Sequence, residues 1–95
     1  SKELIKYLDT NIPNLFKKKK DMDIAYSVLE LLQKQEEIEN FNKKALYILI
    51  REMTNVKTNE ITKVVNVLKK HYRRIVYDYN NAGRRPNTSP IKKFF

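Results

Sequence analysis

Apolar residues recur three and four positions apart along most of this chain, a spacing that predicts amphipathic helices. The clearest predicted helix covers 58–80, where Thr58 is the expected N-cap and Gly83 the expected terminator. Its apolar side chains fall within one sector about 120° wide: Ile61, Val64, Val65, Leu68, Tyr72, Ile75, Val76 and Tyr79. The opposite sector is polar and mostly basic: Lys63, Asn66, Lys70, Arg73, Arg74 and Tyr77.

Three shorter helical segments are predicted upstream. The first covers 4–11, with a short second piece starting at Pro13. The next covers 21–35, with Asp21 as its N-cap. The third covers 37–53, with a possible break at 40–42. Its broad apolar face is typical of a central helix: Ile38, Phe41, Ala45, Leu46, Ile48, Leu49 and Met53.

These patterns predict an all-α fold, namely a single compact bundle of four to five helices with a long C-terminal helix and a basic tail. The chain has one glycine and three prolines, so it contains few helix breakers. We assign 1–82 to the bundle and 83–95 to a basic, flexible tail with two prolines and four basic residues. For Ile91, Phe94 and Phe95, docking back onto the bundle or onto a partner is left open.

Composition argues against catalysis. Ninety-five residues make one domain, and the absence of cysteine excludes disulfides and thiolate metal sites. A single histidine and a single glycine leave no transition-metal cluster and no glycine-rich phosphate loop. The acidic pairs Glu36/Glu37 and Asp21/Asp23 stand where solvated acids are expected. We therefore expect no catalytic residue, cofactor or metal, and the lack of cysteine favours an intracellular location.

The net charge of +9 has two interpretations: it keeps the chain soluble, or it attracts an acidic partner, either nucleic acid or an acidic protein segment. Residues 21–40 are acidic, whereas the segments on both sides are basic. The candidate contact residues are basic or aromatic: Lys63, Lys70, Arg73, Arg74, Tyr77, Arg84 and Arg85. The run of four lysines at 17–20 has two interpretations, a solvated helix end or a phosphate-contacting cluster.

The tail also carries short regulatory patterns. Ser89 is followed by proline and, two residues later, by Lys92, which is an arrangement that proline-directed kinases accept. Phosphorylation would add about −2 charge beside the basic residues and weaken a polyanion contact. The basic pairs 84–85 and 92–93 are a candidate nuclear import signal, which predicts a nuclear location.

The last predicted helix resembles the closing helix of the TFIIS N-terminal domain family, with a looser likeness to the related integrase-binding domain of LEDGF. The likeness is carried by the order Glu60-Ile61, Val64-Val65, Leu68, Tyr72, Ile75-Val76, in which Tyr72 stands where the family usually has tryptophan. Upstream, 24–35 resembles the family's helix that precedes an "LP-x-T" turn. That turn is missing from this chain.

The resemblance implies a nuclear scaffold module of transcription elongation that binds short, disordered acidic and aromatic motifs of its partners. In that family the peptide slot lies at inter-helix loops, which here places it at Ile38, Phe41, Val56 and Lys57. We therefore predict a protein-interaction module. The alternative is a helical domain that binds nucleic acid through the basic face of the last helix and the tail.

Overall fold

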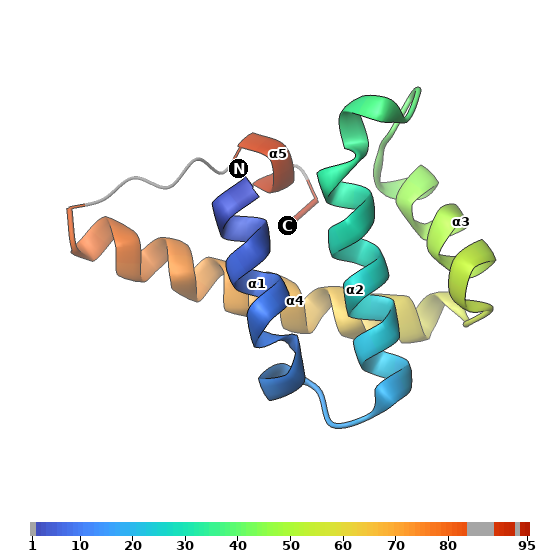
Figure 1. The fold of residues 1–95 in the computed structure, drawn as a ribbon, viewed down its shortest axis with the longest axis horizontal. Coiled ribbons are helices and arrows are strands. Elements are labelled where there is room, and N and C mark those ends of the chain that lie inside the picture. Colours follow the sequence, from blue (N-terminus) through green and yellow to red (C-terminus); the bar gives the residue numbers. More distant parts are fainter. Residues whose placement is uncertain (1, 84–88, 93) are drawn as a thin grey trace.

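A computed structural model describes residues 2–83, 89–92, 94 and 95. Every regular element in these residues is helical, which confirms the all-α prediction: α1 (Lys2–Leu15), α2 (Lys19–Gln33), the 3-10 turn η1 (Gln35–Glu37), α3 (Lys43–Thr54), α4 (Thr58–Asn81) and α5 (Ser89–Lys92). Helices α1, α2 and α3 lie side by side, and the long α4 runs across them (Figure 1). None of the described helices has the length and apolarity that a bilayer-spanning helix needs.

Helix α2 is the centre of the bundle, because it contacts α1, α3, α4 and α5. Both its neighbours and α4 turn apolar side chains toward it. The resulting core is continuous and contains no buried charged or polar residue among those described. Its members are Leu4, Ile5, Leu8, Ile12, Phe16, Ile24, Ala25, Val28, Leu29, Leu31, Leu32, Leu46, Ile50, Ile61, Val64, Val65, Leu68, Tyr72, Ile75, Ile91, Phe94 and Phe95.

Helix α1 is continuous from Lys2 to Leu15, so the predicted interruption near residue 11 is wrong. The polar side chains that suggested it bond back to their own helix. The Thr10 hydroxyl donates to the Lys6 carbonyl at 2.9 Å, and the Asn11 amide donates to the Tyr7 carbonyl at 2.8 Å. Pro13 has no backbone N–H, so α1 lacks one helical hydrogen bond there. Pro13 lies in the last turn of α1, where few helical hydrogen bonds remain to be disrupted.

Helices α2 and α3 begin at residues other than those predicted from the sequence. Helix α2 begins at Lys19, so Asp21 lies in its first turn and the predicted N-cap is wrong. The predicted helix start at residue 37 is also wrong, because residues 38–42 are not helical; the possible break at 40–42 lies within this segment. Asn40 has a φ of 55°, and the Asn42 side chain accepts a hydrogen bond from the backbone N–H of Ala45 at 2.8 Å, which starts α3 at Lys43.

Helix α4 confirms its predicted periodicity. The six positions from Ile61 to Ile75 on the predicted core sector are buried, and Val76 and Tyr79 pack against the core while half-exposed. Its N-cap is Lys57, one residue before the predicted Thr58. Gly83 follows the helix with a φ of +75°, the left-handed conformation expected of it.

The C-terminal apolar side chains dock onto the bundle, which resolves the alternative left open for them. Ile91, Phe94 and Phe95 are all buried. The Phe94 ring lies 5.2 Å from the Phe41 ring, and the Phe95 ring meets the Tyr72 ring edge-on at 5.6 Å, centroid to centroid. The hydrophobic core therefore includes side chains from beyond residue 82.

Candidate functional site

One face of α4 points away from the core and carries the basic side chains singled out from sequence. We call Lys63, Lys70, Arg73, Arg74 and Tyr77 the α4 basic face; all five side chains are exposed, and Tyr77 is 65% exposed. At 1.5 Å per residue they extend over about 21 Å of one straight helix. The structure therefore brings together five of the seven predicted contact residues.

The cations of this face form no internal ion pair. The described residues contain three ion pairs, and none of them includes a member of the α4 basic face. Asp78 is exposed one turn beyond Arg74, at the edge of the face, without an ion pair to it. The positive charge of the face is therefore not neutralised within the described part of the chain.

The spacing of these cations lowers helix stability. Lys70 precedes Arg73 by three residues and Arg74 by four, so like charges lie on adjacent turns of one helix face. Each such pair destabilises a helix by about 0.2–0.5 kcal/mol. An external polyanion would remove this repulsion, whereas the repulsion contributes nothing to the stability of the fold.

His71 borders the same face but is part of the packing. Its ring lies nearly parallel to the Tyr7 ring of α1, and its Nε2 atom is buried without a hydrogen-bond partner. Burial, and secondarily the nearby Arg74 charge, lower the pKa of His71 from its ordinary value. Among the described residues, no group of three or more His, Cys, Asp or Glu side chains is arranged to hold a metal ion.

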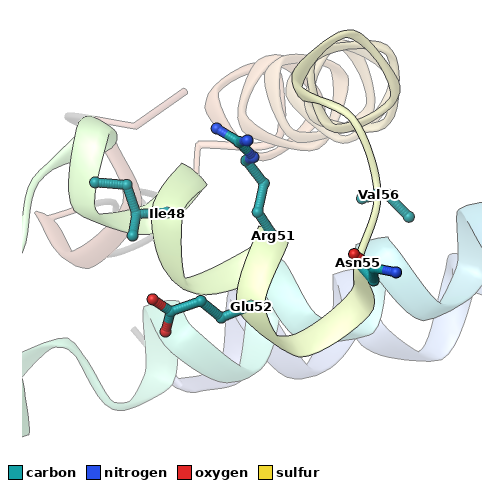
Figure 2. Close-up of a pocket in the computed structure, with 5 residues that line it drawn as sticks. All are labelled: Ile48, Arg51, Glu52, Asn55 and Val56. Carbon is teal, nitrogen blue, oxygen red and sulfur yellow. The ribbon is translucent and has the colours of Figure 1, made fainter.

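Two open hollows lie on a different part of the surface, beside α3. The larger, of about 450 Å³, is lined by residues of α2, α3 and the α3–α4 connection: Lys20, Asp23, Tyr26, Ser27, Glu30, Met53, Thr54 and Val56. The smaller, of about 350 Å³, is lined by Ile48, Arg51, Glu52, Asn55 and Val56. Figure 2 shows Arg51 and Glu52 extending from α3 in different directions. No residue of α4 lines either hollow.

Apolar side chains beside these hollows are exposed, so the core predicted from the sequence is wrong at some positions. Ile48 and Met53 are expected in the interior, but they are 45% and 50% exposed, and Tyr26 on α2 is 38% exposed. Helix α3 packs mainly against α2 and α4, which is too little to cover an apolar sector about 200° wide. The width of that sector is the sequence signal that indicates exposed apolar surface on α3.

The predicted peptide slot is not assembled. Ile38 and Phe41 precede α3, whereas Val56 and Lys57 follow it, and the 12 residues of α3 separate the two pairs by about 18 Å. Phe41 is half-buried against Phe94, and Ile38 also packs against the core. Only Val56 lines a hollow, and Lys57 is an exposed N-cap residue.

The remaining predicted residues lie at the C-terminal end. Arg84 and Arg85 fall outside the described residues. Ser89 is the first residue of α5, and Lys92 in the last turn of that helix is exposed.

No known protein family, no curated protein and no solved structure matches this chain.

Proposed function

We propose that this chain is a non-enzymatic nucleic-acid-binding module that contacts the phosphate backbone through the α4 basic face. The observation that carries the proposal is the set of four exposed, unpaired cations along about 17 Å of one helix. Lysine and arginine neutralise phosphates and release their counterions, which supplies most of the sequence-independent affinity. The exposed Tyr77 ring adds a surface on which a base can stack.

The shape of the face favours nucleic acid over an acidic peptide. Short aromatic motifs bind in hydrophobic slots, and no residue of the α4 basic face lines either hollow described above. The α4 basic face is a convex helix surface, which is the form of element that the major groove of a duplex admits. A phosphate backbone needs cations at intervals along a line and no apolar slot.

The test is equilibrium binding of fluorescent duplex and single-stranded probes, measured by anisotropy. Arg73→Glu/Arg74→Glu should weaken binding at least tenfold, because two phosphate contacts become repulsive. The matched control is Lys43→Glu/Lys44→Glu, which makes the same change in net charge at exposed positions at the start of α3. Equal weakening by both variants would mean that only net charge matters, and would contradict the proposal.

A second candidate function is the binding of short acidic and aromatic protein motifs, as the resemblance to the TFIIS N-terminal domain family implies. The observation that favours it is the gathering of exposed Tyr26, Ile48 and Met53 around the two hollows, with Lys20 and Arg51 beside them. Under this proposal a Phe side chain of the partner would enter a hollow, and the basic residues would contact its acidic neighbours.

Calorimetry with synthetic peptides that contain Phe among Asp and Glu residues tests this second candidate. Binding to the wild-type chain should be lost in Met53→Asp and retained in Arg73→Glu/Arg74→Glu. If the arginine variant loses peptide binding and the Met53 variant keeps it, the hollows are not the binding site.

A further inference from the structure

The corner between α1 and α2 carries a second concentration of positive charge. Lys17 and Lys18 occupy this corner, and Lys19 and Lys20 begin α2; all four side chains are exposed. Lys19 pairs with Asp23 at 3.0 Å and Lys20 pairs with Glu60 at 2.9 Å. Lys17 and Lys18 have no ion pair among the described residues, so they are the two cations of the corner available to a partner.

The Lys20–Glu60 pair fixes this corner against the start of α4. Glu60 lies in the first turn of α4, 40 residues away from Lys20 in sequence. Lys63, the first member of the α4 basic face, follows Glu60 by three residues and so lies on the adjacent turn. In Figure 1 the α1–α2 connection extends past α4 at the lower edge of the molecule, so the corner stands to one side of the helix.

Glu60 does not cancel the local positive charge. Its carboxylate also accepts a hydrogen bond from the Lys57 backbone N–H at 3.4 Å, and the Lys20 bond, together with the charges of Lys20 and Lys57, lowers its pKa. The corner and the first two turns of α4, with its N-cap, together contain six lysines, at 17–20, 57 and 63, and three acidic residues, at 21, 23 and 60. The local balance is therefore positive by three charges.

We propose that Lys17 and Lys18 form a second phosphate-contacting patch, continuous with the α4 basic face through the Lys20–Glu60 pair. This inference rests on the proposed nucleic-acid function and extends its site from one helix to two elements. A bound backbone then follows the α4 basic face and is also held beside the N-terminal end of α4. The corner joins α1 to α2, and both of these helices pack with α4 in one core, so the relative position of the two patches is set before binding.

The experiment compares Lys17→Glu/Lys18→Glu with the control Lys43→Glu/Lys44→Glu on a duplex DNA probe over a range of salt concentrations. The corner variant should bind more weakly than the control, and its slope of log affinity against log salt should be shallower by about two units, as expected for two lost phosphate contacts. Folding should be unaffected, because acidic side chains at the start of α2 interact favourably with the helix dipole. A thermal melt followed by circular dichroism verifies this.

The outcomes separate the two proposals. If the corner variant matches the control in affinity and salt slope while Arg73→Glu/Arg74→Glu fails to bind, the corner patch is wrong and the α4 site stands. If the wild-type chain binds no nucleic acid at moderate salt, the proposed function itself is wrong, and the corner patch with it.

Discussion

The rings of Tyr7 and His71 are stacked between α1 and α4, with their centroids 6.4 Å apart and their planes 13° from parallel. This contact places the one histidine of the chain between a helix of the bundle and the arginine side of α4. Its Nε2 atom is buried with no hydrogen-bond partner. Protonation of His71 would place a charge at a site that burial and Arg74 both disfavour.

We expect the free energy of unfolding to fall with pH below about 6.5 because of His71. The folded-state pKa lies below the ordinary value of 6.5, so between these two values the unfolded chain binds more protons than the folded chain. Stability is therefore lost as pH falls through that window. Denaturant unfolding at several pH values between about 5.5 and 7.5 measures the effect.

His71→Phe is the control for this prediction. Phenylalanine keeps an aromatic ring against Tyr7 but neither titrates nor leaves a buried polar atom unpaired. The variant should show a flatter pH dependence than the wild-type chain in the same window. Identical profiles for the two proteins would show that His71 does not contribute to the pH dependence.

Loss of the C-terminal apolar contacts should destabilise the whole bundle. Ile91 is fully buried, so Ile91→Ala should lower the free energy of unfolding by about 2–5 kcal/mol. Lys92→Ala, at an exposed position in the same short helix, should change it by less than about 0.5 kcal/mol. Chemical denaturation of both variants decides the matter: similar small changes would mean that the segment is not part of the core.

The cap of α3 should contribute a smaller, local amount. Asn42→Ala removes the acceptor for the Ala45 N–H and should cost about 0.5–2 kcal/mol in unfolding free energy. Asn42→Asp retains an acceptor at this position and should recover most of the loss. An alanine variant as stable as the wild-type chain would indicate that water replaces the cap without penalty.

Sequence periodicity predicts α4 well because its apolar residues occupy one narrow sector and its cations the opposite one. It predicts α3 poorly. The apolar sector of α3, which includes Ile48 and Met53, is so broad that the sequence does not show how much of it the neighbouring helices cover. The core positions of Ile91, Phe94 and Phe95 depend on long-range packing against Phe41 and other distant residues. No local pattern in a segment with two prolines specifies such packing.

The candidate site, like the fold, could be predicted from the sequence only in part. The α4 basic face could be predicted, because it depends only on the geometry of one helix. The position of the lysine run beside α4 could not, since it depends on a contact between Lys20 and Glu60 across 40 residues of sequence. The predicted peptide slot takes residues from the loops at both ends of α3, and the length of α3 keeps these loops about 18 Å apart.

The salt dependence of nucleic-acid binding tests the central claim most directly. For the wild-type chain, log affinity for a duplex should fall linearly with log salt, with a slope of about −0.9 for each phosphate neutralised. Arg73→Glu/Arg74→Glu should reduce both the affinity and the slope, while Lys43→Glu/Lys44→Glu should leave the slope nearly unchanged. A wild-type affinity independent of salt, or a slope unchanged by the arginine substitutions, would contradict phosphate binding by the α4 basic face.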